Sequence, residues 1–316
     1  MTKKIITLVI TLAITFMSLL SLASCKKLSY DDIDPSAEIE NDVIWNKNNV
    51  RISTLRLDFF ENRADLVISI SNNNSYNISI FCGTVGYCVN SINGYMMSDG
   101  YLNVDIPSKT NVHEKISFEY GNLLSFGITQ IADIEVGFEI KLENESAETI
   151  YTGPLRIKTN IAKNYGYPNT YQEALESGTL ERTLDSSLEY FSPKTIYNKN
   201  GVHVLSTAIM KASDLVLCIE IKNDSSKEAF VAISDFYVNG ILLSDYVTSF
   251  ERINPHATRI ISIAFSSLLQ NFKSNYSQIE KIEEMSFLIG EKKTDTPEKV
   301  TIQTKSIRLP KELAKS

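Results

Sequence analysis

Residues that usually carry enzyme chemistry are scarce in this sequence, which has three histidines and four cysteines in 316 residues. It has no Gly-x-Ser-x-Gly elbow for a nucleophilic serine, and none of the histidines lies in a local catalytic signature. It also lacks a Gly-x-x-x-x-Gly-Lys phosphate loop, a His-x-x-x-His pair and paired-cysteine zinc motifs. We therefore predict no catalytic residues, no metal site and no cofactor, and we expect a protein that is not an enzyme.

An excess of basic charge is also lacking. Lysine and arginine together number 31 and aspartate and glutamate 38, which gives a formal net charge of −7 at pH 7. A negative chain is repelled by phosphate backbones, so nucleic acid is not an expected partner. The hydrophobic content of 43% and the charged content of 22% are ordinary for a globular protein, and the length corresponds to about two domains.

Long apolar runs are absent except for one at the N-terminus, residues 5–20, which follows Lys3 and Lys4. This arrangement is typical of a secretory signal, and no later segment reaches the roughly 20 apolar residues that span a bilayer. The sequence Leu22-Ala23-Ser24-Cys25 resembles the lipobox of bacterial lipoproteins. That resemblance implies cleavage before Cys25, attachment of diacylglycerol to its thiol and acylation of the new amine with a chain such as palmitate. The alternative is an ordinary secretory signal cut near Ala23.

These features predict a signal peptide at residues 1–24 and a mature chain anchored by lipid at Cys25. We expect it on the cell membrane, facing outside the cytoplasm, because two or three acyl chains at about 0.8 kcal/mol per buried methylene give stable anchoring. Residues 25–43 are polar and acidic with little apolar periodicity, which predicts a flexible tether. Its carboxylates lack the spacing of an EF-hand and are interpreted as solvated charges.

The remaining chain contains a long internal repeat. Residues 44–52 read IWNKNNVRI and residues 196–204 read IYNKNGVHV. Further landmarks recur about 150 residues apart: Asp65-Leu66-Val67-Ile68 with Asp214-Leu215-Val216-Leu217, and Val89-Asn90 with Val238-Asn239, leaving a three-residue insertion around Ser91-Ile92-Asn93. This period is the size of a domain rather than of a solenoid repeat. The pattern therefore predicts a duplicated domain.

Hydrophobic and polar residues alternate in both copies. The longest runs are Ile134, Val136, Phe138, Ile140 and Leu142 in the first copy, and Leu215, Leu217, Ile219 and Ile221 in the second. Such alternation, broken by polar turns, predicts many short antiparallel strands with one buried face. We therefore predict an all-β fold of two tandem immunoglobulin-like β-sandwich domains, residues 44–160 and 196–316. In the connector, residues 161–195, the capping-box pattern Thr170-x-x-Glu173 and the following Gly178 predict a short helix.

The shared landmarks also point to a family. Asn-Val-Arg-Ile or Gly-Val-His-Val at the first strand, Asp-Leu-Val in the second, a later Val-Asn, a Leu-Leu turn and an Ile-x-x-Ile-Glu strand occur in both copies. They resemble an immunoglobulin-like domain of the unknown-function type that recurs in lipoproteins of low-GC Gram-positive bacteria. The resemblance covers nearly the whole mature chain. Because its motifs are turn and core residues, it implies a fold and no activity.

Candidate binding residues come from the places where the two copies differ, because function in such folds usually lies on loops. They are Tyr87 and Ile92 in the first copy, Phe236 and Tyr237 in the second, and Tyr165, Tyr167 and Tyr171 in the connector. Aromatic side chains of this kind could anchor a protein or glycan partner, or they could close the seam between the domains. We expect a non-enzymatic binding module; a structural spacer or envelope assembly component is the alternative, and a hydrolase is less favoured.

The cysteines and histidines of the two domains are interpreted as structural. Cys82 and Cys88 flank a turn, which is compatible with a local disulfide or with two small apolar strand residues. Cys218, aligned with Ser69 of the first copy, is predicted to be inert packing. His113 and His256 both shortly precede the same predicted strand, which indicates loop structure inherited by duplication rather than metal ligands.

Overall fold

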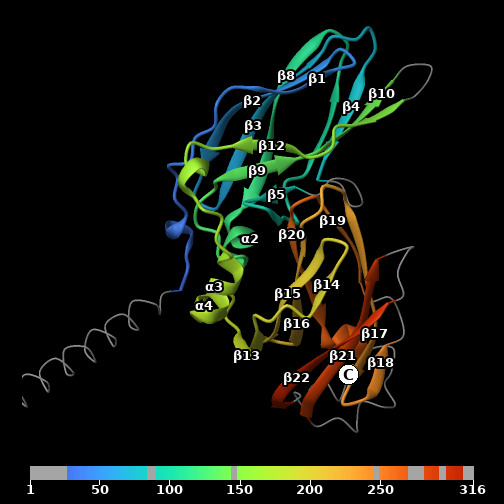
Figure 1. Ribbon diagram of the computed structural model, residues 1–316. Coiled ribbons are helices and arrows are strands. Elements are labelled where there is room, and N and C mark those ends of the chain that lie inside the picture. Colours follow the sequence, from blue (N-terminus) through green and yellow to red (C-terminus); the bar gives the residue numbers. More distant parts are fainter. Residues whose placement is uncertain are drawn as a thin grey trace, which may run out of the picture.

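The computed structural model describes residues 27–83, 90–143, 148–244, 249–269, 281–291 and 297–308. These residues form two β-sandwiches joined by a short helical connector (Figure 1). Each sandwich encloses its own hydrophobic core, and most of the chain is β-strand. The predicted all-β fold with tandem sandwiches is confirmed. Cys25 and Tyr87 lie outside the described residues.

The first sandwich packs one sheet against a second sheet that is split in two. The first sheet has the order β1-β2-β3-β8. Its strands are β1 (Val43–Lys47), β2 (Val50–Phe59), β3 (Arg63–Asn72) and β8 (Thr110–Glu119). Opposite lie β4 (Ile78–Cys82), β7 (Leu102–Ile106), β10 (Phe138–Leu142) and β11 (Thr149–Tyr151), continued by β5 (Ser91–Ile92), β6 (Tyr95–Met96), β9 (Asp133–Val136) and β12 (Leu155–Lys158). The split falls at Gly137 and near Gly153, where the chain passes from one half to the other.

The second sandwich repeats this plan with unbroken strands. One sheet contains β13 (Ser187–Ser192), β14 (Tyr197–Lys199), β15 (Val202–Lys211), β16 (Leu215–Asn223) and β20 (Thr258–Ala264). The other contains β17 (Ala229–Val238), β18 (Ile241–Ser244), β19 (Ser249–Ile253), β21 (Lys281–Glu291) and β22 (Glu298–Arg308). The order β15-β16-β20 corresponds to β2-β3-β8, and β17 next to β21 corresponds to β4 next to β10. The plan of one sandwich has therefore been used twice.

Alternation along the strands builds the cores. On β16, Leu215, Leu217, Ile219 and Ile221 are fully buried, as the pattern predicts. Phe236 and Phe287 stack inside the second sandwich with ring centroids 5.3 Å apart. Each fully buried side chain of this size contributes about 1.5–3 kcal/mol to stability. The predicted inward faces are thus the ones that hold each pair of sheets together.

Asn72 and Asn223 make the same contacts in the two sandwiches. The side-chain amide of Asn72 donates to the carbonyls of Tyr76, Ile106 and Pro107 at 2.9, 3.1 and 3.2 Å. That of Asn223 donates to Lys227, Ile253 and Asn254 at 2.7, 3.1 and 3.1 Å. Equivalent residues in this strand are therefore 151 positions apart (223 − 72), and Glu220, not Cys218, corresponds to Ser69. The alignment of Asp65 with Asp214 is two residues out of register, because a shift of two preserves the alternation of a strand.

Residues 28–42, called the strap below, pack along the first sandwich. Ile33 and Ala37 are buried at 6% and 1% exposure, and Asp34 N–H donates to the Thr129 carbonyl at 2.8 Å. Farther along, Glu38 N–H donates to Asn160 Oδ1 at 2.9 Å. The prediction of a flexible tether is therefore wrong for these residues. A few apolar residues without periodicity are enough to pack a segment against a neighbouring sheet, and amino-acid composition does not show that this packing occurs.

The connector forms two short helices against the lower end of the first sandwich (Figure 1). The helical elements are η1 (Tyr30–Asp32), α2 (Tyr120–Ser125), η2 (Ala162–Asn164), α3 (Thr170–Glu176), α4 (Thr179–Thr183) and α5 (Phe265–Leu269). The predicted connector helix is α3, and Gly178, at φ 66°, ends it. Its N-cap is Asn169 rather than Thr170, because Thr170 Oγ1 donates to the Phe126 carbonyl instead. In the part of the chain that the structure describes, no helix is long and apolar enough to cross a membrane.

The two sandwiches share a continuous sheet at their junction. β6 pairs in parallel with β20 through Tyr95 and Thr258, and Thr258 N–H donates to the Gly94 carbonyl at 2.7 Å. This contact joins β12-β9-β5-β6 of the first domain to β20-β16-β15-β13 of the second. Backbone pairing, in addition to side-chain packing, therefore couples the two domains.

The cysteines and histidines have structural surroundings. Cys82 is buried and its thiol donates to Asn90 Oδ1 at 3.2 Å, whereas Cys88 lies outside the described residues. Burial raises the pKa of the Cys218 thiol, which keeps it in the less reactive protonated form. His256 adopts φ 56° in a turn, as does Lys109 at φ 57° in the first copy, whereas His113 lies within β8. The two histidines are therefore not equivalent, contrary to the prediction.

Candidate binding groove beside β12

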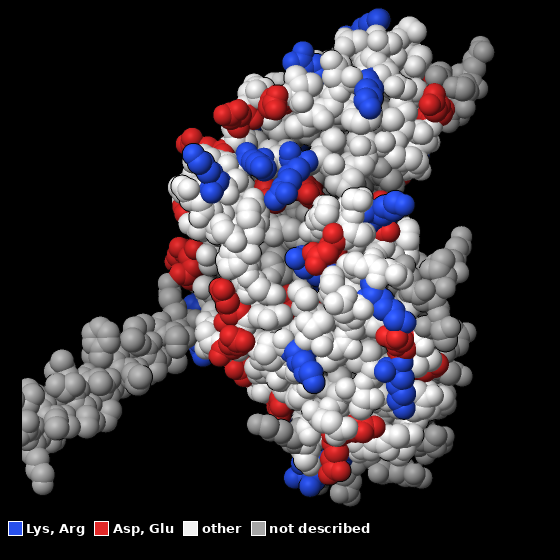
Figure 2. Space-filling model, in the orientation of Figure 1, with Lys and Arg blue, Asp and Glu red and all other residues white. Residues whose placement is uncertain are grey.

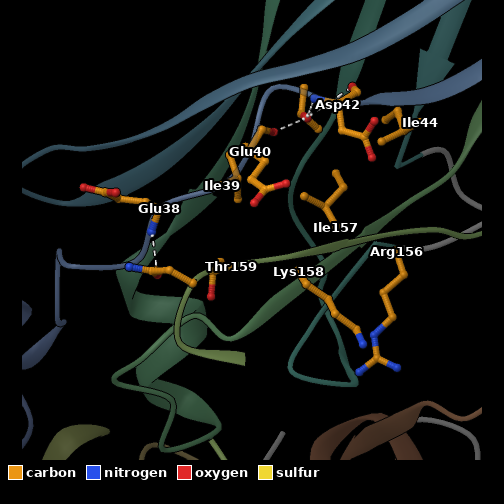
Figure 3. Close-up of a pocket in the computed structure, with 11 residues that line it drawn as sticks. Glu38, Ile39, Glu40, Asp42, Ile44, Arg156, Ile157, Lys158 and Thr159 are labelled. Carbon is orange, nitrogen blue, oxygen red and sulfur yellow. Dashed lines mark hydrogen bonds between the residues drawn. The ribbon is translucent and has the colours of Figure 1, made fainter. Parts of the chain in front are cut away.

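A groove of ≈ 610 Å³ lies between the strap and β12, at an open side of the first sandwich (Figure 3). It is lined by Glu38, Ile39, Glu40, Asp42, Ile44 and Thr54 on one side and by Arg156, Ile157, Lys158, Thr159 and Asn160 on the other. Both walls are edges of sheets, since β1 ends the first sheet and β12 ends the other. The groove therefore lies between the edge strands of the two sheets, β1 and β12, which are not hydrogen-bonded to each other.

One end of the groove is closed by a short stretch of strand pairing. Ile39 forms an antiparallel bridge with Thr159, and Asn160 N–H donates to the Glu38 carbonyl at 2.9 Å. The strap then turns away to β2, where Thr54 Oγ1 donates to the Glu40 carbonyl at 2.7 Å. Beyond this point the groove continues along β12 as far as Arg156.

The backbone of β12 presents hydrogen-bonding groups to this space. β12 pairs with β9 in the register Leu155 to Val136 and Ile157 to Ile134, and Thr159 N–H donates to the Ala132 carbonyl at 2.9 Å. In an antiparallel ladder alternate residues point to opposite sides, so the N–H groups of Arg156 and Lys158 point away from β9 and into the groove. In the part of the chain that the structure describes, no backbone carbonyl accepts a hydrogen bond from either N–H. The edge is therefore able to accept another strand.

The side chains around the groove carry both signs of charge. Ile157 is buried, whereas Arg156 and Lys158 are exposed and project together away from it (Figure 3). The opposite wall carries the exposed carboxylates of Glu40 and Asp42. In the space-filling view basic side chains gather over β12, with acidic side chains nearby (Figure 2). A polypeptide with charges on one face and apolar residues on the other would match this pattern.

Arg156 is held in place by a buried carboxylate and an aromatic ring. Its guanidinium forms an ion pair with Asp133, which is 1% exposed, and lies over the ring of Tyr167 at 5.5 Å. Burial raises the pKa of Tyr167 to about 12, and the hydrogen bond to Asp133 adds to the effect. Burial also raises the pKa of Glu135, an effect that Arg156 partly offsets. The charged end of Arg156 is thereby fixed at the rim before any partner arrives.

A second, smaller pocket of ≈ 260 Å³ lies at the junction of the two domains and shares Arg156 with the groove. It is lined by Asn93, Gly94, Tyr95, Arg156, Tyr167, Pro168, Asn169, Leu205, Lys222, His256 and Thr258. Asn169, one of these lining residues, donates to the carboxylate of Glu220 at 2.8 Å; Glu220 is 1% exposed and also accepts a hydrogen bond from Gln172 at 2.6 Å. Ser206 donates to the same carboxylate at 2.6 Å. These bonds fasten the connector to β16, so this pocket belongs to the domain seam.

The structure separates the predicted binding residues. Ile92, Tyr171 and Phe236 are buried at 0%, 3% and 0% exposure, so they are core residues and the prediction that they contact a partner is corrected. The sequence analysis selected these three residues because the two copies of the domain differ there. Copies also differ where the cores or the interface between the domains are packed differently. Tyr165 is half-buried and accepts a hydrogen bond from Asn93 at 2.9 Å, and half-buried Tyr237 lies under Lys299 at 4.8 Å.

Of the predicted binding residues that the structure describes, only Tyr167 is exposed, at 40%; it lines the junction pocket and contacts Arg156, which also lines the groove. The residues that sequence reasoning missed are Arg156, Lys158 and the strap. The alternation of Leu155, Arg156, Ile157 and Lys158 could have indicated a strand with one charged face, but nothing in it shows that the strand lies at an edge. In the described residues no group of three or more His, Cys, Asp or Glu side chains is placed to hold a metal ion.

Comparison with known proteins gives no family. No family model and no curated protein matches the chain. Among solved structures it is similar to the transglutaminase of red sea bream, with 8% sequence identity and a TM-score of 0.23. The match covers 83% of this chain but 31% of that enzyme, so the chain spans about a third of its length. This similarity carries no inference about activity.

Proposed function

We propose that the chain is a membrane-anchored, extracytoplasmic lipoprotein that acts as a non-enzymatic binding module, and that its groove takes an extended segment of a partner protein. The observation that carries the proposal is the outward-facing edge of β12, which offers the N–H groups of Arg156 and Lys158 beside an open groove. Strand addition to an exposed edge is a common mode of peptide recognition, in which backbone hydrogen bonds supply affinity. The bridge between Ile39 and Thr159 supports it, because there the edge already pairs with an extended segment.

The lining of the groove favours a protein over a glycan. None of the described residues that line it is aromatic, so these residues offer no flat ring of the kind that commonly stacks on a sugar. A bound strand would meet Arg156 and Lys158 on one side of the groove and the carboxylates of Glu40 and Asp42 on the other, and its apolar residues would approach Ile44 and Ile157. We therefore expect a partner sequence in which apolar residues alternate with charged residues of both signs.

A display library of seven-residue peptides tests the proposal. The purified mature chain is compared with Lys158→Pro, which removes an outward N–H, and with Lys158→Ala, which keeps the N–H and removes the charge. Strand addition predicts that Lys158→Pro weakens the selected peptides about two- to tenfold beyond the effect of Lys158→Ala, since each lost backbone bond is worth about 0.5–1.5 kcal/mol. Lys158→Ala should weaken them about two- to threefold. Equal binding by all three proteins would refute the groove as the site, and failure to select any peptide would favour a structural spacer.

The anchor is tested separately in cells. Cys25→Ser should abolish incorporation of labelled fatty acid and partitioning into detergent. If the variant still partitions and is processed normally, the lipoprotein hypothesis is wrong, whatever the groove binds.

A further inference from the structure

The strap determines where the N-terminal end of the described chain emerges. Leu28 N–H donates to Thr183 Oγ1 of α4 at 3.1 Å, and the ring of Tyr30 packs edge-on against Tyr120 with centroids 5.8 Å apart. Asp34 accepts a hydrogen bond from Gln130 at 2.9 Å. Together with buried Ile33 and Ala37, these contacts hold the strap from the groove down to the connector helices (Figure 1). The first described residues therefore lie beside α4.

Chain length then limits where the lipid can be. Position 25 precedes Leu28 by three residues, which span at most about 11 Å even when fully extended. The opposite end of the first sandwich is much farther away. β8 runs from Thr110 to Glu119, about 30 Å at 3.4 Å per residue, and leads into α2, which packs against α4. An anchor at position 25 is thus near the connector and far from the turn at Ser75, which lies at the Thr110 end of the sheet.

We infer that the face formed by η1 and α4 is the membrane-facing surface of the protein and that its partner is the lipid bilayer. The inference rests on the proposed lipidation of Cys25. A lipid that enters the bilayer there brings this face to the headgroups, with the domain junction above it. If a flexible tether joined the lipid to two tandem domains, neither domain would lie at a fixed distance from the membrane.

The side chains of this face agree with contact at the headgroup level. Tyr30 and Leu184 are large hydrophobic residues with 47% and 43% exposure, and they flank the point where the strap meets α4. A tyrosine combines an apolar ring with a polar hydroxyl, which suits the interface between lipid and water. The neighbouring charges are more acidic than basic, with Asp31, Asp32, Glu181 and Asp185 against Lys27 and Arg182. Electrostatic attraction to anionic lipids is therefore not the cause of this orientation; the strap and the anchor are.

Energy transfer to the vesicle surface tests the orientation. The mature chain with Cys88→Ser is coupled through the thiol of Cys25 to phosphatidylcholine vesicles that contain maleimide-headgroup lipid and an acceptor-labelled lipid. A fluorescent donor is introduced, as a non-natural amino acid, either at Asp185 beside α4 or at Ser75 in the far turn; both residues are exposed. We expect severalfold greater transfer from position 185. Equal transfer from the two positions, or greater transfer from position 75, would overturn the inference.

A strap-release variant provides a second readout. Ile33→Asp with Ala37→Asp places charges in the buried contacts of the strap and should reduce the transfer from position 185 toward that from position 75. If transfer from position 185 is unchanged while the strap is exposed to proteolysis, the strap does not set the orientation and the inference fails. Because coupling is chemical, the result does not depend on lipidation in cells, which the Cys25→Ser experiment decides independently.

Discussion

The side chain of Asn93 makes the same three hydrogen bonds in the first sandwich as that of Asn239 in the second. Asn93 donates to the Gln130 carbonyl at 2.7 Å and accepts from the N–H groups of Ala132 and Asp133 at 2.7 and 3.2 Å. Asn239 donates to the Lys281 carbonyl at 2.6 Å and accepts from Glu283 and Glu284 at 2.9 and 3.0 Å. The two asparagines, each followed by glycine, thus hold equivalent hairpin turns.

This equivalence changes the alignment of the copies. Asn239 corresponds to Asn93 and not to Asn90, whose amide donates to the Gly100 carbonyl at 2.7 Å. Ile80 pairs with Ile140 as Val231 pairs with Glu291. Thirteen positions separate Ile80 from Asn93 (93 − 80) and eight separate Val231 from Asn239 (239 − 231), so the first copy carries five extra residues here. The predicted three-residue insertion is too short.

Replacing these asparagines should have unequal effects. Asn93 is 8% exposed, whereas Asn239 is exposed, so only the Asn93→Ala change leaves buried N–H groups without water or partner. We expect Asn93→Ala to lower the free energy of unfolding by about 2–3 kcal/mol and Asn239→Ala by about 1 kcal/mol. Urea titration measures both, with Asn198→Ala at an exposed strand position as control. An equal loss for the two variants would contradict the importance of burial.

The edge position of β12 predicts a contrast between two adjacent prolines. Lys158→Pro removes an N–H that points into the groove, so we expect a loss of stability below about 1 kcal/mol. Ile157→Pro removes a ladder hydrogen bond to Ile134 and strands a buried carbonyl, which should cost about 2 kcal/mol or more. Thermal unfolding of the two variants provides the test. If Lys158→Pro is the more damaging change, the edge of β12 is not free.

The tyrosines of the connector divide into a seam residue and a surface residue. Tyr171 is 3% exposed, and its buried hydroxyl, whose pKa burial raises, lies against Cys218 of the second sandwich. Tyr171→Ala should therefore cost about 3–5 kcal/mol, as for other large aromatic truncations in a core. Tyr167→Ala, at a 40% exposed position, should cost less than about 1 kcal/mol. Denaturant titration measures the loss of unfolding free energy in both variants. Similar losses would show that Tyr167 also packs in the interface between the domains.

Glu135 should make stability depend on pH. Burial raises its pKa above the ordinary 4.5, so the folded chain binds this proton more tightly than the unfolded chain. Its favourable contribution is thus present at low pH and is lost as the pH rises from about 4.5 through the raised value. Asp34, with a lowered pKa, acts in the opposite direction and below 3.8, outside this window.

The measurement compares the wild-type chain with Glu135→Gln between pH 4 and pH 7. The free energy of unfolding of the wild-type chain, relative to that of the Glu135→Gln variant, should fall as the pH rises, because glutamine cannot lose a proton. Arg156, Asp133 and His256 face this carboxyl group, so all three remain unchanged in the comparison. Glu61→Gln, at an exposed loop position, is the control and should show no such trend. Parallel pH profiles for wild type and Glu135→Gln would rule out the buried carboxyl as the cause.

Local sequence patterns were sufficient for the strands and for part of the connector. Alternation along β16 identified its buried face correctly, because side chains of a strand point to opposite sides in turn. Gly178 marked the end of α3 because glycine readily adopts the positive φ found there. The capping residue was missed by one position, since Asn169 and Thr170 are both good caps and only the contact of Thr170 with Phe126 decides between them.

The sequence by itself determined the duplication, the inward faces of the strands and the pattern that predicts an N-terminal anchor, because each is written in short-range composition or period. Only the tertiary structure decided which strands are edges, that the strap is packed, and that Tyr171 is buried while Tyr167 is exposed. These properties depend on which distant segments meet: Ile39 reaches Thr159, and Leu28 reaches Thr183, across more than one hundred residues of chain. Local alternation is the same for an edge and a central strand, since the neighbour that distinguishes them is chosen by the whole fold.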